Sequence, residues 1–224
     1  MLTRFIFSTL LFTLPLPLLA RDLNETETNT LLSNIASANK GRASLQTDFK
    51  EVKTLKLVRD PIVSEGTLWL KLPNQFKKEQ RSGSGSTYIC DGKEFWIYYP
   101  VFKKAECYPL GHEKKIDESL AAVTAGFDLV QLKEIYNVSA SEEANGWKLQ
   151  LVPRKSSLRR NMKELVLSLS KEFEIESANV SLPKDGKLLT TFRNHKHGAI
   201  SDSVFKFNPP LGTEITRPLD RTSR

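Results

Sequence analysis

Two segments of this chain, residues 66–73 and 91–100, carry large apolar side chains on both faces of what reads as β-strand. The apolar residues concerned are Leu68, Leu70, Leu72, Phe95, Trp96, Ile97, Tyr98 and Tyr99. Successive side chains of a strand point to opposite faces, so a sheet with one face in water would alternate apolar with polar residues. These strands instead need burial on both faces or a cavity to line, and the flanking sequence is too polar to cover both faces. The pattern therefore favours a sheet that lines an apolar cavity.

The rest of the chain alternates in a similar way, with two helical interruptions. Apolar residues recur at helical spacing over 26–39 and again over 116–136. Alternation and turn residues predict strands at 45–58, 67–71, 76–80, up to Cys90, around Trp96, around Cys107, and at 147–152, 164–170, 173–182, 188–194 and 203–208. We expect an α+β, mainly β fold: an incomplete, half-open antiparallel β-barrel of about eleven strands, with an N-terminal helix and an inserted helical lid over the cavity.

Residues 1–20 read as a secretory signal peptide. Arg4 precedes an apolar run over 5–19, and Ala20 provides a small residue at the cleavage site. The run is shorter than the about 20 residues that a membrane-spanning helix needs, and Pro15 and Pro17 interrupt it. We therefore expect residues 21–224 to be exported to the periplasm as a single domain and a monomer.

The net charge of +7 favours anionic partners, such as acidic protein surfaces or anionic lipid headgroups. Nucleic acid fits poorly, because the aromatic residues alternate within strands and do not form an exposed basic platform. The densest basic cluster, over 154–163, lies between two apolar strands. It could dock an acidic partner, but such a loop is more often a solvated edge, and we slightly favour the solvated edge.

The order of motifs resembles the bacterial outer-membrane lipoprotein carrier (LolA) family. The residues that carry the resemblance are Gly-Thr-Leu-Trp-Leu-Lys-Leu-Pro at 66–73, Phe76 three residues later, Asp-Gly-Lys-Glu-Phe-Trp-Ile-Tyr-Tyr-Pro at 91–100, and Phe-Lys-Phe-Asn-Pro-Pro-Leu-Gly at 205–212. Between them, in matching order, lie the lid-like stretch 118–136, an apolar strand running into Pro153, a strand over 162–170, and a Lys-Asp-Gly-Lys turn at 184–187. The ordered set spans roughly residues 31–216.

The resemblance implies a non-enzymatic periplasmic chaperone. Such a protein binds the acyl chains of lipoproteins released from the inner membrane and carries them to the outer membrane. Each CH₂ group costs about 0.8 kcal/mol in water, so several acyl chains cannot cross an aqueous space unprotected. Family members receive their cargo from an inner-membrane ABC transporter and pass it to an outer-membrane receptor, and we expect these partners and no cofactor here.

The resemblance also assigns roles to the apolar residues. The expected cavity residues are Phe49, Leu68, Leu70, Phe76, Phe95, Trp96, Ile97, Leu149, Leu151, Leu167, Phe205 and Phe207. The expected lid residues are Leu31, Leu32 and Ile35 of the N-terminal helix and Leu120, Val123, Phe127 and Leu129 of the insertion. Lid residues would fill the hollow in the empty protein, and acyl chains would replace them on loading. In the family the aromatic equivalent to Phe76 is tied to loading and transfer.

Leu72 departs from the family pattern. The family often has an arginine immediately before the proline, where it ties the lid to the barrel, and leucine cannot donate those hydrogen bonds. Lys71 is adjacent, and Lys77-Lys78 stands where Arg-Trp is more usual. This latch position keeps open a carrier or sensor of another lipid, such as a glycolipid or polyene.

Cys90 and Cys107 invite a disulfide in an oxidising compartment. The turn at Asp91-Gly92 and a second turn at 100–102 would place the two cysteines on the strands that flank Trp96. Two strand spacings separate such residues by about 9.5 Å, beyond the roughly 7 Å that a bridge tolerates. Both states remain open, and the geometry slightly favours two half-buried thiols.

Little in the sequence points to catalysis. His195 and His197 would share one face of a strand and could be imagined as metal ligands, but exposed histidines near a strand end are the more common case. We therefore expect no metal site and no enzyme, while an exported metal-dependent enzyme stays a less favoured alternative. Asn24-Glu-Thr, Asn137-Val-Ser and Asn179-Val-Ser are glycosylation-type tripeptides and leave a secreted eukaryotic lipid binder as a further alternative.

Overall fold

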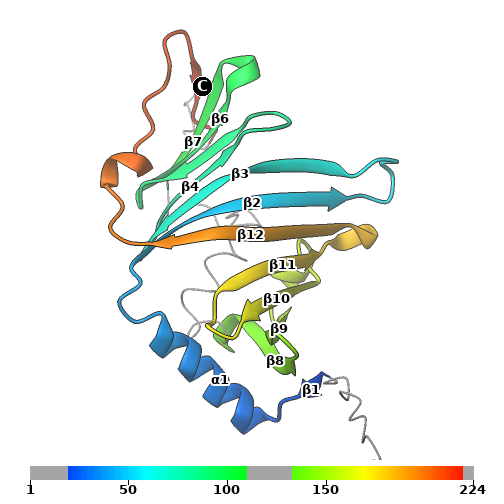
Figure 1. Cartoon of the computed structure of the whole chain (residues 1–224). Coiled ribbons are helices and arrows are strands. Elements are labelled where there is room, and N and C mark those ends of the chain that lie inside the picture. Colours follow the sequence, from blue (N-terminus) through cyan, green and yellow to red (C-terminus); the bar gives the residue numbers. More distant parts are fainter. Residues whose placement is uncertain (1–19, 110–132, 219–224) are drawn as a thin grey trace, which may run out of the picture.

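Thirteen strands form one open sheet in the computed structural model of the protein, which describes residues 20–109 and 133–218. Across the sheet the strands run in the order β1-β8-β9-β10-β11-β12-β2-β3-β4-β5-β6-β7-β13. Neighbouring strands are antiparallel throughout, except that β13 is parallel to β7. β1 and β13 lie at opposite ends of this order, so the described strands leave the sheet unclosed (Figure 1).

The strands are two to eleven residues long, and short turns connect many of them. The strands are β1 (Arg21–Asp22), β2 (Ser44–Thr54), β3 (Ile62–Lys71), β4 (Gln75–Gln80), β5 (Thr87–Cys90), β6 (Glu94–Tyr99), β7 (Lys104–Pro109), β8 (Tyr136–Glu143), β9 (Gly146–Pro153), β10 (Glu164–Ser170), β11 (Ile175–Ser181), β12 (Lys187–His197) and β13 (Glu214–Thr216). The α-helices with described bounds are α1 (Glu25–Ala38) and α4 (Ser156–Arg159), and residues 133–135 are also α-helical. The 3-10 helices in the described residues are η1 (Pro100–Phe102), η2 (Pro183–Asp185) and η3 (Asp202–Phe205).

The mainly β architecture and the open sheet confirm the predicted fold class, with differences in detail. The sequence patterns do not predict β1, β8 or β13, and residues 203–208, predicted as a strand, contain η3 instead. Most of the predicted lid, 116–136, and nearly all of the signal peptide, 1–20, lie outside the described residues; Tyr136 begins β8. Within the described part of the chain, none of the helices is both long and apolar enough to cross a membrane.

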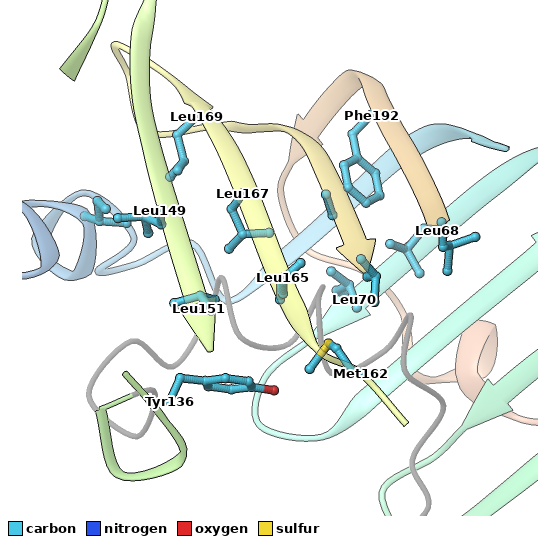
Figure 2. Packing of buried hydrophobic residues seen from close by; sticks show 14 of the residues in the cluster. Leu68, Leu70, Tyr136, Leu149, Leu151, Met162, Leu165, Leu167, Leu169 and Phe192 are labelled. Carbon is cyan, nitrogen blue, oxygen red and sulfur yellow. The ribbon is translucent and has the colours of Figure 1, made fainter. Parts of the chain in front are cut away.

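One face of the sheet carries a single hydrophobic cluster, and we call it the core face. Directly paired residues of antiparallel strands lie on the same face, so the register shows which side chains meet. One cross-strand row of the core face comprises Leu45, Leu70, Phe76, Cys90, Phe95 and Tyr108. A second row, from β8 to β12, comprises Ala140, Leu149, Leu167, Ala178 and Thr190. Figure 2 shows Leu149 on β9 and Leu165 and Leu167 on the neighbouring β10, and Leu68 and Leu70 of β3 belong to the same cluster.

The N-terminal helix packs on the core face. Asn24 caps α1 through a reciprocal capping box with Glu27, which satisfies backbone donors at the helix start. Leu31, Leu32 and Ile35 are at most 6% exposed and belong to the hydrophobic cluster. The helix thus presents one apolar stripe to the sheet at its β8–β11 side (Figure 1).

The chain after β12 runs along the opposite face. Lys71 binds the carboxylate of Asp202 at 2.5 Å and the carbonyl of Ile200 at 3.1 Å. Further along, the ring of Phe207 lies 5.1 Å from Trp96 and 5.4 Å from Tyr98, measured between ring centroids. β13 then pairs with β7, so this C-terminal segment covers the face of β6 and β7 that points away from the core.

Candidate functional site

Most residues predicted to line a cavity lie together on the core face. The members of this set in the hydrophobic cluster or packed against it are Phe49, Leu68, Leu70, Phe76, Phe95, Leu149, Leu151 and Leu167. Ile97 pairs with Tyr88 on the same face and is half-buried. The α1 residues predicted to cover them, Leu31, Leu32 and Ile35, join the same cluster. An aliphatic region over β8–β12 therefore adjoins an aromatic region over β4–β6.

Three predicted cavity residues lie elsewhere. Trp96 pairs with Ile89 and Cys107 and is covered by Phe207, which puts both aromatic rings on the opposite face. Phe205 is completely buried, yet it belongs to η3 and not to the core-face cluster. The alternation of β6 explains the difference, because Phe95 and Trp96 must point to opposite sides of the sheet. Trp96, Phe205 and Phe207 therefore help to pack the C-terminal segment against the opposite face of the sheet.

The predicted latch position, Leu72, is partly exposed to solvent. Leu72 is 42% exposed directly after β3, and its backbone N–H donates to the carbonyl of Ala43 at 2.9 Å. The neighbouring Lys71 is engaged with Asp202 on the opposite face and does not reach toward the core face. Leu120, Val123, Phe127 and Leu129 of the predicted lid lie outside the described residues.

A small pocket, partly open to solvent, enters the core face beside the end of α1. Its enclosed space is about 30 Å³, which admits a water-sized group but not an acyl chain. The lining residues are Asn39, Leu45, Thr47, Leu68, Phe173, Glu174, Ile175, Phe192, His195 and His197. The cluster residues Leu45, Leu68 and Phe192 make the pocket continuous with the hydrophobic cluster. This pocket is therefore too small to hold an acyl chain by itself.

A buried donor lies next to this pocket. The indole of Trp147 stacks on Phe173 with ring centroids 6.3 Å apart, and its buried Nε1–H has no acceptor in the described structure. A buried donor without a partner costs about 1–3 kcal/mol. An acceptor on a bound ligand would remove that cost.

The two histidines are part of the pocket rim and bind protein groups. His197 Nε2 lies 2.8 Å from the Glu174 carboxylate, whose same oxygen accepts a 2.8 Å bond from Arg42. His195 Nε2 lies 2.9 Å from the backbone carbonyl of Ile175, in a stretch where the β12–β2 register is irregular. Among the described residues, no three His, Cys, Asp or Glu side chains gather in a way that could hold a metal ion. The rim therefore ties the end of α1 to the β10–β11 turn and to β12.

Burial shifts the titration of several groups in the sheet. The thiol of Cys90 has a raised pKa because burial penalises the thiolate, and the pKa of Tyr136 is raised for the same reason. The pKa of Tyr99 is raised by burial first and then by the nearby Glu106 carboxylate. Cys90 and Cys107 are unbridged and are both buried, at 3% and 0% exposed, more deeply than the half-burial predicted. The core face around Cys90 and Tyr136 is thus a poorly hydrated environment.

Sequence reasoning missed an ion pair on this face. Lys78 Nζ lies 2.7 Å from Glu51 Oε2, and both side chains are 12% exposed. The signal was available, since Glu51 is in phase with Phe49 and Lys78 is in phase with Phe76 along their strands. In the basic loop over 154–163, by contrast, one cationic side chain is hydrogen-bonded locally, because Arg159 donates to the backbone carbonyls of Pro153 and Arg154.

Comparison with known proteins identifies relatives of this chain. A family model described as outer membrane lipoprotein carrier protein LolA matches residues 40–208. An outer-membrane lipoprotein carrier protein of Cronobacter sakazakii is 27% identical over 152 residues, covering 67% of this chain and 70% of that protein. One of Salmonella paratyphi B is 24% identical over 198 residues, covering 86% and 93%. An uncharacterized conserved protein of Thermus thermophilus has a similar fold, with a TM-score of 0.50 at 12% identity over 84% of this chain and 98% of that one.

Proposed function

Since the chain belongs to the outer-membrane lipoprotein carrier (LolA) family, we propose that it is a periplasmic chaperone for lipoproteins. In this proposal it binds the acyl chains of lipoproteins released from the inner membrane and carries them to the outer membrane. An inner-membrane ABC lipoprotein-releasing transporter loads it, and an outer-membrane receptor takes the cargo. The role needs no cofactor and no covalent step.

The observation that carries the proposal is the joined apolar surface of the core face. Leu149, Leu151 and Leu167 on one side and Phe76 and Phe95 on the other belong to one contiguous cluster or pack against it. An acyl chain laid on such a surface removes CH₂ groups from water, at about 0.8 kcal/mol each. Because the described strands form an open sheet, a chain can enter and leave without passing a closed wall.

A carrier must also release what it binds. Affinity for cargo is useful only if the next acceptor binds the acyl chains more strongly, so the hydrophobic contact with the chains should be of moderate strength. The apolar stripe of α1 supports this idea, because Leu31, Leu32 and Ile35 contact the cluster and could be exchanged for acyl chains.

A carrier or sensor of another lipid, such as a glycolipid, is the second candidate. Leu72 favours it, since the latch arginine of the family is replaced and Lys71 is bound to Asp202 instead. The two candidates share the apolar face and differ only in the polar part of the ligand.

Release of lipoproteins from spheroplasts tests the proposal. Purified protein is added to spheroplasts that synthesise an outer-membrane lipoprotein, and the lipoprotein in the supernatant is measured. Phe76→Glu places a charge on the core face, whereas the matched control Leu189→Glu changes a leucine that is 41% exposed. Leu189 pairs with Val52 and Asn179, away from the core face.

The expected result is release by the wild type and by Leu189→Glu, with little release by Phe76→Glu. Absence of release by the wild type, in a system whose own carrier restores release, would contradict the lipoprotein role. Equal release by all three proteins would show that the core face does not bind the cargo.

A further inference from the structure

Lys78 and Glu51 place two opposite charges within the apolar core face. Their Nζ and Oε2 atoms are 2.7 Å apart, and each side chain is only 12% exposed. The register puts Lys78 opposite Leu68 on one side and Tyr88 on the other. Glu51 stands opposite Thr190, in the same row as Leu149 and Leu167. The pair therefore lies beside the surface proposed to hold acyl chains.

The surroundings hold the pair in place. The ammonium of Lys78 lies over the ring of Phe49, at 5.0 Å from its centroid, and over that of Tyr88, at 5.8 Å. Both contacts are favourable cation–π geometries. Thr190 Oγ1 donates to Glu51 Oε2 at 3.4 Å. The charges are thus fixed by neighbours from β12, β2 and β5.

Stability alone does not explain this pair. The free energy needed to remove two charges from water can exceed the attraction between them. Replacing a buried ion pair by apolar residues of similar size therefore often leaves a protein as stable or makes it more stable. A second pair, between Lys50 on β2 and Glu65 on β3, makes the contrast clear, since its charged atoms lie 3.1 Å apart and its side chains are 59% and 52% exposed. That pair remains hydrated, as surface pairs do. The pair on the core face is largely buried instead: Phe49 and Tyr88 lie beside Lys78, and the polar residues Thr190 and Ser64 lie beside Glu51.

We propose that Lys78 and Glu51 select lipids by the charge of their polar part, accepting uncharged polar groups and rejecting anionic headgroups. The proposal rests on the proposed function and defines the ligand of the same face. A lysine ammonium has three donors, and the bond to Glu51 uses one of them, so others can reach ester or amide carbonyls of an acylated ligand. Because Glu51 already neutralises Lys78, a phosphate at the same place would gain no net attraction from the pair, yet it would lose its hydration and lie close to the Glu51 carboxylate.

This selectivity suits a lipoprotein carrier. The acyl anchor of a lipoprotein joins its chains through uncharged ester and amide groups, whereas a membrane also offers anionic phospholipids in large excess. A charge-balanced site would keep the carrier from filling with phosphatidylglycerol. The proposed site would also accept the uncharged polar part of a glycolipid.

Lipid exchange tests the proposal. Lipid-stripped protein is incubated with vesicles of equal parts diacylglycerol, phosphatidylethanolamine and phosphatidylglycerol, separated from them, and its bound lipids are quantified by mass spectrometry. The variants are Glu51→Gln, the double variant Glu51→Gln/Lys78→Gln, and the matched surface control Glu65→Gln. The double variant restores charge balance, so it separates charge from loss of fold; circular dichroism checks that each variant is folded.

The wild type and Glu65→Gln should bind diacylglycerol in preference to phosphatidylglycerol. Glu51→Gln leaves the positive charge of Lys78 without a neutralising carboxylate, so the ratio of bound phosphatidylglycerol to bound diacylglycerol should rise by about tenfold. The double variant should reverse that rise. If the wild type and Glu51→Gln bind phosphatidylglycerol and diacylglycerol in the same ratio, the selectivity proposal is overturned and the proposed carrier function is unaffected. A wild-type protein that takes up no acyl lipid at all would overturn both.

Discussion

The rings of Phe76 and Phe95 lie 5.7 Å apart, centroid to centroid, although a whole strand separates their backbones. Both residues stand opposite Cys90, Phe76 from β4 and Phe95 from β6. The two rings therefore meet over the small cysteine side chain, and Tyr108 extends the surface with its ring 6.2 Å from Phe95. A large side chain at position 90 would separate them, so the aromatic region depends on this small residue.

Phe76→Ala should destabilise the protein by about 3 kcal/mol, because it removes a ring that is 6% exposed and leaves a cavity between Leu70 and Cys90. Urea unfolding followed by circular dichroism measures the change. Phe102→Ala, at a ring that is 69% exposed in η1, is the matched control and should change stability by less than about 0.5 kcal/mol. Equal effects of the two changes would show that Phe76 is not packed as described.

Gly66→Ala should cost about 2 kcal/mol or more, or prevent folding, because a Cβ at this position would overlap backbone. It would meet the carbonyl oxygen of Glu79 on β4 and come within 2.9 Å of the Phe49 ring. A rotamer change cannot relieve a clash with backbone, so β3 and β4 would have to separate. The yield of soluble protein and the urea midpoint report the effect. A variant as stable as the wild type would contradict the close approach of the strands.

Sequence patterns predict the strands with strong alternation and miss those without it. β3, β6, β9 and β10 are rich in large apolar residues in phase, and the sequence predicts all four. β8 reads YNVSASEE, in which small and polar residues conceal the alternation, and the prediction lacks it. The phase of Phe205 and Phe207 suggests a strand, but here the chain packs across the sheet instead of joining it.

Neither cysteine should react with iodoacetamide in the native protein. Cys90 and Cys107 are buried and unbridged, and burial raises the pKa of the Cys90 thiol, so little thiolate is available. Mass spectrometry after labelling should show no modification in buffer and two modified cysteines in urea. Rapid labelling of the native protein would contradict the burial of the thiols, and no labelling in urea before reduction would reveal a disulfide.

The ion pair between Lys71 and Asp202 should make stability depend on pH. The hydrogen bond from Lys71 holds the pKa of Asp202 below its ordinary value of 3.8. Because the folded-state pKa is the lower one, the contribution is complete above pH 3.8 and is lost as the pH falls through the folded-state pKa. Asp202→Asn should therefore be less stable than the wild type at pH 7, with the gap closing as the pH falls below 3.8. A gap that stays constant over this range in urea unfolding would show that the pair does not form.

Which face each aromatic residue takes could not be predicted from the sequence, because both phases of β6 are apolar. Phe95 and Trp96 are both predicted to line the cavity, and their strand pairing and ring partners, Phe76 and Phe207, place them on opposite faces. The Lys78–Glu51 pair was missed for a related reason. A charged residue in an apolar phase reads as an irregularity until its partner on another strand is known, and 27 positions separate these two.

Mass spectrometry of the protein purified from a periplasmic extract without detergent tests the central claim most directly. If the core face carries lipoproteins, acylated lipoproteins should co-purify with the wild type and with Leu189→Glu and be lost from Phe76→Glu. A wild-type protein that carries no acylated species, or carries the same species after Phe76→Glu, would contradict the account.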